Sequence, residues 1–236
     1  MRLLAVDTAT RICSVAVVEN NVLLAELTVN HGHTHSTHLM PMVDALLFQC
    51  RLSVQDLDGF AITIGPGSFT GLRIGLSTIK GLAFALGKPA AGVSTLDALA
   101  YQFPFAGCLI CPMIDARKGE VYAAGYRYQE GTLNQVWQAG AVSPEDLVIG
   151  IKETCLYVGS GAPLYRDRIT ELAGSRAVFA PSGQNDLRAA TVGILGLQRL
   201  GQGEPTPLSQ LNPWYIRASD AERKLTDRSS DQMHPA

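Results

Sequence analysis

An eleven-residue string constrains this chain more than any other feature, and it reads Gly65-Pro-Gly-Ser-Phe-Thr-Gly-Leu-Arg-Ile-Gly75. It follows an apolar, strand-like segment (residues 60–64) and leads into a long apolar segment typical of a helix. Glycines at such a junction allow a sharp turn and a close approach of the backbone to a second surface. Ser68 or Thr70 can cap the helix by accepting a hydrogen bond from one of its first N–H groups. No Gly-Lys-Ser/Thr follows the turn, so the string is not a phosphate-binding P-loop.

Size and composition indicate a well-packed α/β protein. A chain of 236 residues, 47% of them apolar, can bury a full core as one large domain or two small ones. Its formal net charge of -2 provides no overall basic footprint for nucleic acid. Five cysteines and no signal peptide predict reduced thiols and a cytoplasmic protein. The longest apolar helix carries Arg73 and Lys80 and is predicted to be too short to cross a bilayer.

The predicted elements repeat in the two halves of the chain. In the first half, strands are expected at 3–6, 12–18, 22–29, 60–64 and 90–93, and helices at 36–52 and 70–86. In the second half, strands are expected at 108–114, 120–128, 134–139 and 156–158, and helices from 143 and over 185–200, the latter capped by Asn185 or Asp186. Each half opens with a buried strand that ends in an aspartate, Asp7 or Asp115. This order indicates an internal duplication.

The loops after three strands could form a nucleotide cleft. A carboxylate at Asp7 could hold magnesium through water, and the Thr8 hydroxyl with nearby amides could contact phosphate. The alternative is a turn in which both side chains satisfy their own backbone. Asp115 starts a weaker counterpart, because Ala, Arg and Lys follow it where a phosphate cradle needs glycines and a hydroxyl. Gly159 and Gly161 could let a flat base approach closely, or could form a plain turn. Weak binding of ATP, ADP or magnesium therefore stays open.

The segment 70–86 is apolar around most of its circumference. A sheet can cover one stripe of such a helix, and the other stripe needs a neighbouring helix or a second protein. The helix at 36–52 could share this surface. The alternative is that both helices pack together inside one monomer.

A histidine cluster and a cysteine pair resemble metal-binding motifs, but neither has the ligand pattern of a metal site. His31, His33, His35 and His38 lie within eight residues, yet no Cys, Asp or Glu accompanies them, so no metal site is predicted and the role of the cluster stays open. The pair in Cys108-Leu-Ile-Cys111 lies in a predicted strand, where residues three apart point to opposite faces. Both thiols are expected to fill the core.

The chain resembles the TsaB (YeaZ) family from residue 1 to about residue 217. The matching motifs are the Gly65–Gly75 string, Ala5-Val-Asp-Thr-Ala9, the helix entry His35-Ser36…Leu39…Pro41, Lys80-Gly-Leu-Ala83, Gly92-Val-Ser-Thr-Leu96, Ile114-Asp-Ala-Arg117…Gly119-Glu-Val-Tyr122 and Pro213…Tyr215-Ile-Arg217. The resemblance implies the two-lobed actin/sugar-kinase/Hsp70-like (ribonuclease H-like) α/β fold, in which helices flank a mixed sheet in each lobe. We expect an N-terminal lobe over 1–100 with partner-binding helices, and a C-terminal lobe over 101–217 whose last segment could return to the first lobe. A polar tail without fixed structure is expected over 218–236.

The resemblance also implies a function. Members of this family act in bacterial synthesis of threonylcarbamoyladenosine in tRNA, as partners of the transferase TsaD and the ATPase TsaE. The chain is therefore expected to be a non-catalytic scaffold subunit with no required cofactor, which also pairs with itself and meets tRNA only through the complex. The transferase's His-x-x-x-His metal pair is replaced here by Thr95 and Leu99, which cannot bind iron or zinc as imidazole does. The implied partner surface comprises Leu39, Val43, Leu46, Leu72, Gly75, Ile79 and Ala83.

An enzyme is the competing hypothesis. Asp7, Thr8 and Asp115 would then line the cleft of a nucleotide-dependent ATPase or phosphotransferase. The altered second loop argues against it.

Overall fold

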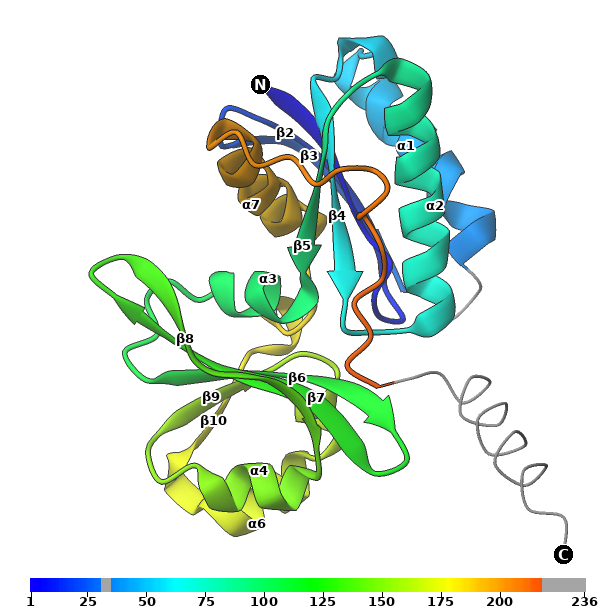
Figure 1. Ribbon diagram of the computed structural model, residues 1–236. Coiled ribbons are helices and arrows are strands. Elements are labelled where there is room, and N and C mark those ends of the chain that lie inside the picture. The colour runs from blue at the N-terminus through cyan, green and yellow to red at the C-terminus, as the bar shows by residue number, and fades with distance from the viewer. Residues whose placement is uncertain (31–34, 218–236) are drawn as a thin grey trace, which may run out of the picture.

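Two five-stranded mixed sheets organise the computed structural model, which describes residues 1–30 and 35–217 (Figure 1). The first sheet has the order β3-β2-β1-β4-β5, built from β1 (Arg2–Asp7), β2 (Cys13–Glu19), β3 (Val22–Val29), β4 (Gly59–Gly65) and β5 (Ala90–Ser94). The second has the order β10-β9-β6-β7-β8, built from β6 (Leu109–Arg117), β7 (Glu120–Gln129), β8 (Thr132–Val142), β9 (Cys155–Val158) and β10 (Ala177–Phe179). In each sheet three consecutive strands pair antiparallel and two more add in parallel. The repeated connectivity confirms the predicted duplication and the two-lobed α/β fold.

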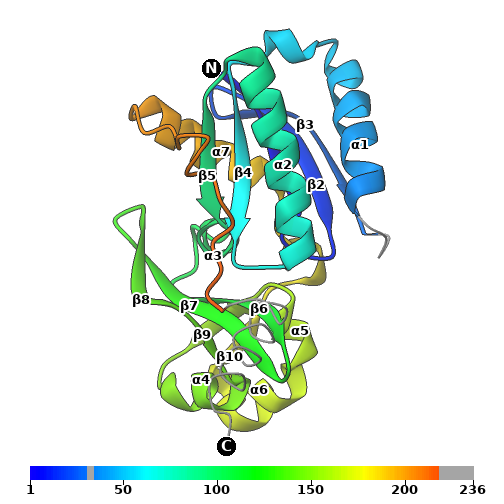
Figure 2. The same cartoon turned by 45° about the vertical axis from the view of Figure 1, so that its right-hand side comes forward.

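Helices cover the sheets and fill the space between them (Figures 1 and 2). Helices α1 (His35–Cys50) and α2 (Phe69–Leu86) cover one face of the first sheet, and α7 (Ala189–Gly201) covers the other. Helix α3 (Thr95–Tyr101) contacts strands of both sheets. Helices α4 (Pro144–Gly150) and α6 (Arg166–Ala173) pack together on the second sheet, where the single turn α5 (Gly161–Leu164) also contacts β6 and β9. Short 3-10 turns lie at Val54–Asp56, Gly174–Arg176 and Ser182–Gln184.

Three apolar clusters form the core of the described residues. One lies beneath α1 and α2, and one lies between the second sheet and helices α4 and α6. The third joins both sheets: it contains Leu3 from β1, Leu99 from α3 and Tyr126 from β7. The Tyr126 hydroxyl donates a 2.6 Å hydrogen bond to Asp97 of α3, which ties the second sheet to that helix. The two lobes therefore share one core.

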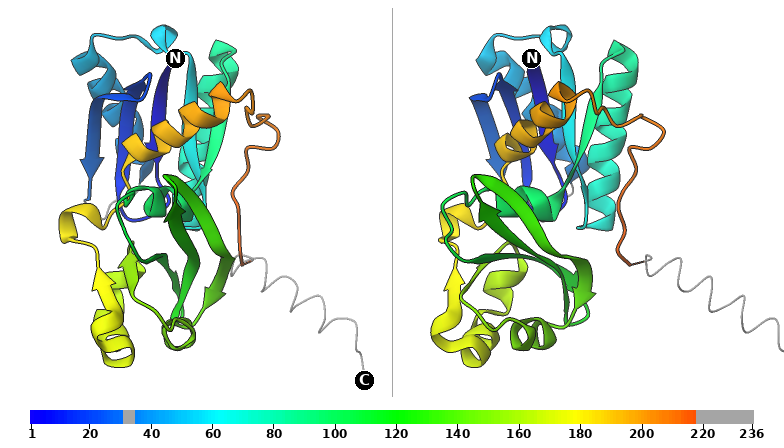
Figure 3. Two further views of the ribbon diagram at one scale, coloured as in Figure 1. Left: turned by 90° about the vertical axis from the view of Figure 1, so that its left-hand side faces the viewer. Right: turned by 60° about the vertical axis from the view of Figure 1, so that its left-hand side comes forward.

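After α7 the chain returns along the first sheet as an irregular segment with one turn, residues 204–215, which we call the strap (Figure 3). The Thr206 N–H donates to the Ala90 carbonyl at 2.8 Å, and the Trp214 N–H donates to the Ile64 carbonyl at 2.7 Å. The Gly92 N–H donates to the Thr206 hydroxyl at 3.1 Å. Because β5 is an edge strand, the bonds to Ala90 and Gly92 occupy backbone groups that would otherwise be open to another chain.

Several elements differ from the sequence-based expectation, and among them α6 and β10 were not expected. Helix α7 begins at Ala189, four residues after the predicted cap, because Asn185 is bonded elsewhere. The carbonyl oxygen of its side chain accepts from the Gly159 N–H at 3.1 Å, and its NH2 group donates to the Gly159 carbonyl at 3.2 Å. Helix α3 was not expected; Ser94 caps it by accepting from the Asp97 N–H at 3.2 Å.

Helix α2 also corrects the expectation that it is too short for a membrane. Its 18 residues span about 27 Å, which is enough by length and composition alone. The helix nevertheless carries Arg73 and Lys80, and it packs against β4 and β5. These contacts are those of a sheet-covering helix.

The start of α2 is pressed against the loop that follows β1. Ser68 is the cap, because its hydroxyl accepts from the Gly71 N–H at 3.2 Å, and its own N–H donates to the Ala9 carbonyl at 2.6 Å. A methyl group at Gly71 would lie 2.1 Å from the Thr8 carbonyl oxygen, and one at Gly75 would lie 2.3 Å from the Thr8 hydroxyl. This close contact therefore requires glycine at Gly71 and Gly75.

We predict opposite effects of alanine at two glycines of α2. Gly71→Ala should lower the free energy of unfolding by about 1–3 kcal/mol, because the methyl group overlaps the backbone of Thr8. A methyl group at Gly81 would meet no atom within 4 Å, so Gly81→Ala should raise the free energy of unfolding by up to about 1 kcal/mol through helix propensity. Denaturant unfolding of both variants measures the difference. Equal stability of the two would contradict the proposed packing.

Candidate functional site

Asp7 lies at the end of β1, fully buried at the mouth of the predicted cleft. One oxygen, Oδ1, accepts from the Ala9 N–H at 3.0 Å and from the Thr63 hydroxyl at 2.7 Å. The other oxygen, Oδ2, has no hydrogen-bond partner among the described residues, and neither has the buried hydroxyl of Thr8. Asp7 therefore bonds to its own loop through Ala9, as in the alternative derived from the sequence, whereas the Thr8 hydroxyl does not.

Burial governs the electrostatics of Asp7. Loss of water around the carboxylate raises the pKa of Asp7 from 3.8 to about 6. The hydrogen bonds from Ala9 and Thr63, and the nearby His35 ring, offset part of that rise. His35 itself is buried, with Nε2 2.8 Å from the Thr10 carbonyl oxygen. This histidine supports the loop after β1.

The second loop is also bonded to itself. Oδ1 of Asp115 accepts from the Arg117 N–H at 2.8 Å, while the Asp115 N–H donates to the Ser160 hydroxyl at 3.2 Å. A methyl group at Gly159 would lie 2.6 Å from the Met113 carbonyl oxygen, and one at Gly161 would lie 3.1 Å from the same atom. Gly159 and Gly161 therefore allow this loop to pack closely against the backbone of β6.

These loops do not fit a nucleotide. The N–H groups of Ala9, Arg117 and Gly159, which could have held a phosphate, already donate within the chain. The Asp7 carboxylate is closed to solvent. No chemical step can therefore be derived through a nucleotide at these residues. Asn185, which holds Gly159 in place, was missed as a cleft residue, because a contact across 26 positions leaves no local signal.

Metal ligands do not gather elsewhere in the part of the chain that the structure describes. Within residues 1–30 and 35–217, no group of three His, Cys, Asp or Glu side chains could hold an ion. His31 and His33 lie outside the described residues.

The buried Asp7 predicts a pH-dependent stability. Since its pKa in the folded state exceeds the ordinary 3.8, folding is most favoured with Asp7 protonated. That stability is complete below about pH 4 and is lost as the pH rises to about 6, at a cost of about 3 kcal/mol. Asp7→Asn should remove this loss. The free energy of unfolding of the variant should therefore rise relative to that of the wild type as the pH increases over that range. Denaturant unfolding across about pH 4 to 7 measures it.

Asp115→Asn serves as the matched control, because Asp115 is partly exposed. Parallel pH curves for wild type and Asp7→Asn would contradict the assignment to Asp7.

The residues predicted to face a partner lie instead in the core. All seven are buried under α1 and α2, against the first sheet; Leu39 also lines the groove between the two helices, whereas the other six are covered within this chain. The seven are Leu39, Val43, Leu46, Leu72, Gly75, Ile79 and Ala83.

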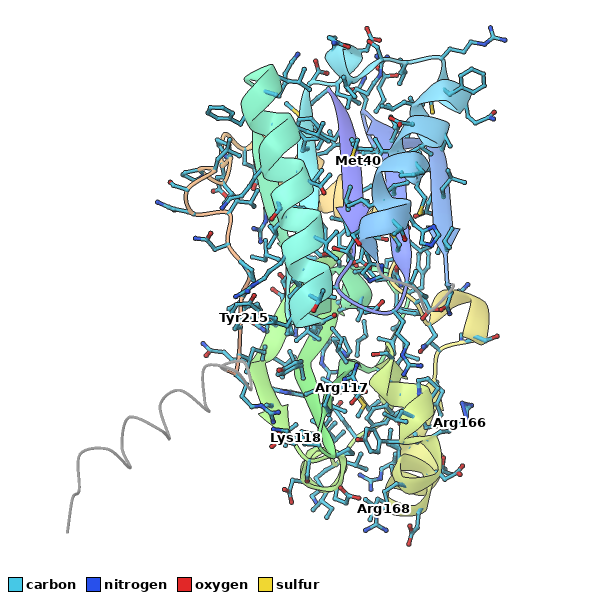
Figure 4. The ribbon with its side chains drawn as sticks, turned by 90° about the vertical axis from the view of Figure 1, so that its right-hand side faces the viewer. Met40, Arg117, Lys118, Arg166, Arg168 and Tyr215 are labelled. Atoms are coloured by element: carbon cyan, nitrogen blue, oxygen red, sulfur yellow. The ribbon has the colours of Figure 1, made fainter. Side chains whose placement is uncertain are left out.

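The outward sides of α1 and α2 enclose a groove instead. Its volume is about 540 Å³, and Met40 of α1 lies at one wall (Figure 4). Ile74 and Thr78 of α2 form part of the opposite wall. Near the ends of the two helices, Phe48 is 79% and Phe84 is 82% exposed, far more than apolar side chains of a covered helix. The remaining groove residues are Ser36, Leu39, Phe69, Thr70, Arg73 and Ser77.

Known proteins resemble this chain along nearly its whole length. A family model described as TsaD, tRNA N6-adenosine threonylcarbamoyltransferase, matches residues 25–224. The tRNA threonylcarbamoyladenosine biosynthesis protein TsaB of Bacillus subtilis is 33% identical over 227 residues, which covers 95% of this chain and 97% of the relative. The protein of the same name from Escherichia coli is 31% identical over 235 residues, covering 95% and 98%. The chain belongs to the TsaB (YeaZ) family.

Solved structures agree with this membership. YeaZ from Pseudomonas aeruginosa is 30% identical, with a TM-score of 0.75 over 91% of this chain and 99% of that one. Component A of the Acidaminococcus fermentans (R)-2-hydroxyglutaryl-CoA dehydratase has a TM-score of 0.53 at 10% identity, covering 85% and 99%. That second likeness concerns the fold alone. The fold is the two-lobed actin/sugar-kinase/Hsp70-like architecture that the sequence resemblance implied.

Proposed function

We propose that the chain is a non-catalytic scaffold subunit in the synthesis of threonylcarbamoyladenosine in tRNA, and that it binds the transferase TsaD and the ATPase TsaE. Membership in the TsaB family supports a place in this pathway. The observation that carries the scaffold role is the contrast between a self-bonded cleft and an open groove between α1 and α2. The chain would act in the cytoplasm and meet tRNA through the complex.

The groove suits a helical partner. Ser77, Gly81 and Ala85 are exposed on α2 and follow one another at intervals of four residues, so small side chains line one side of the helix. A helix packed there could approach closely, while its larger side chains fill the space beside Met40 and Ile74. Since the TsaD model matches this chain, TsaD would present similar helices of its own. The same face would allow a second copy of the chain to bind by two-fold symmetry.

An ATPase or phosphotransferase is the second hypothesis. It needs a carboxylate that reaches magnesium or water, whereas Asp7 is fully buried and Ala9, Arg117 and Gly159 have no free N–H for phosphate. We therefore favour the scaffold and propose that no cofactor is required. Calorimetry of the pure chain with ATP and magnesium separates the two hypotheses: the enzyme requires binding and turnover, and the scaffold requires neither.

Met40→Glu should weaken binding to TsaD by about tenfold or more. It places a charge in the groove, where the partner's apolar side chains would have to desolvate it. Because Met40 is 38% exposed, the fold should survive the change. Titration calorimetry with purified TsaD measures the affinity.

Phe105→Glu is the matched control, since Phe105 is 98% exposed and lies in the loop between α3 and β6. It should bind TsaD as the wild type does. If Met40→Glu also binds normally, the groove is not the docking surface.

A further inference from the structure

A second, smaller cavity lies on the other flank of α2, between the helix and the strap. Its volume is about 150 Å³. Arg73, Ser77 and Lys80 of α2 line one side, and Leu211, Pro213 and Tyr215 of the strap line the other. Figure 4 shows Tyr215 and Met40 on opposite sides of α2, so the helix separates this cavity from the groove.

The guanidinium of Arg73 is held in a fixed position. Its central carbon lies 3.8 Å from the centre of the Phe69 ring, and its Nε donates to the Tyr215 hydroxyl at 3.0 Å. The Phe69 and Tyr215 rings stack with their centres 5.0 Å apart, so both supports are themselves fixed. The two terminal nitrogens of Arg73 have no bonded partner among residues 1–30 and 35–217. They remain available to a ligand.

Lys80 adds a second cation to the same cavity. Its ammonium donates to the Asn212 side-chain carbonyl at 3.1 Å, which leaves two of its three N–H groups for another acceptor. The lining of the cavity contains no carboxylate, and in the described part of the chain neither Arg73 nor Lys80 forms an ion pair. The cavity therefore holds two positive charges that no anion balances there.

The cavity and the groove lie on either side of the same exposed part of α2, and Arg73 and Ser77 line both. A protein that lies along α2 would therefore cover the two cavities together. We infer that the cavity receives the carboxylate of an Asp or Glu side chain of the protein that docks in the groove. This inference rests on the proposed function. It specifies in addition that the partner must present a negative charge next to the groove.

A carboxylate fits these donors better than the phosphates of an RNA. The free edge of a guanidinium can donate two parallel hydrogen bonds to one carboxylate, and stacking on an aromatic ring preserves that edge. Binding of RNA phosphates instead needs an extended basic surface, and this chain has a net charge of -2 with an apolar groove beside the cavity. The ion pair would set the position of the partner along α2.

Affinity for TsaD tests the inference through charge reversal. Arg73→Glu and Lys80→Glu should each weaken binding by about tenfold or more, because a carboxylate would then face a carboxylate. Lys80→Arg should retain binding. Lys152→Glu is the matched control, because Lys152 is exposed in the loop between α4 and β9, and it should bind normally. Added salt should weaken the wild type more than Lys80→Glu.

Zero-length carbodiimide cross-linking of the wild-type complex tests whether Lys80 contacts a carboxylate of the partner directly. A Lys80 that only supported the fold would not form such a cross-link. The reaction should join the Lys80 amine to a carboxyl group of TsaD, and Lys80→Arg should lose that link while the complex still forms. If wild type does not bind TsaD, the proposed function itself fails. If wild type binds and both charge-reversed variants bind equally well, the carboxylate site is wrong. If the charge-reversed variants bind tRNA more weakly but bind TsaD with unchanged affinity, the carboxylate site is wrong and the cavity binds phosphate.

Discussion

The contact between the start of α2 and the loop after β1 determines the rest of this structure. Ser68 donates its N–H to the Ala9 carbonyl, and glycines allow the helix to lie directly on Thr8. This contact closes the loop around Asp7 and at the same time fixes the rotation of α2 about its axis. Leu72, Ile79 and Ala83 consequently face the sheet, and the side that carries Arg73 and Ser77 faces outward.

The same contact also determines how the polar groups of the loop after β1 are used. In this chain the loop amides and the Asp7 carboxylate are used within the fold, and the central cluster joins the two sheets into one core. What stays open is a helical surface with an apolar groove on one flank and, on the other, two cations that form no ion pair within residues 1–30 and 35–217. The Gly65–Gly75 string shapes both regions, since it ends the strand beside Asp7 and begins α2.

Local signals in the sequence predicted most of the fold, because alternation, turn residues and caps act over a few positions. The hairpin strand Val22–Val29 and the antiparallel strands that open each half were predicted, and Ser68 was one of the two candidate caps. Asn185 was misassigned because its partner, Gly159, is distant in sequence. Six of the seven expected partner residues are covered within the chain, because periodicity reveals the apolar stripes of a helix and cannot tell which one faces the sheet. The strap has no periodicity, so only the family resemblance indicated that this last segment could return to the first lobe.

Reconstituted tRNA modification with TsaD, TsaE and this chain tests the central claim most directly. If Asp7 serves the fold and not a reaction, the Asp7→Asn chain should support threonylcarbamoyladenosine formation at the wild-type rate wherever it binds TsaD equally well. An Asp7→Asn chain that binds TsaD normally yet fails to support modification would contradict the account and make the cleft catalytic.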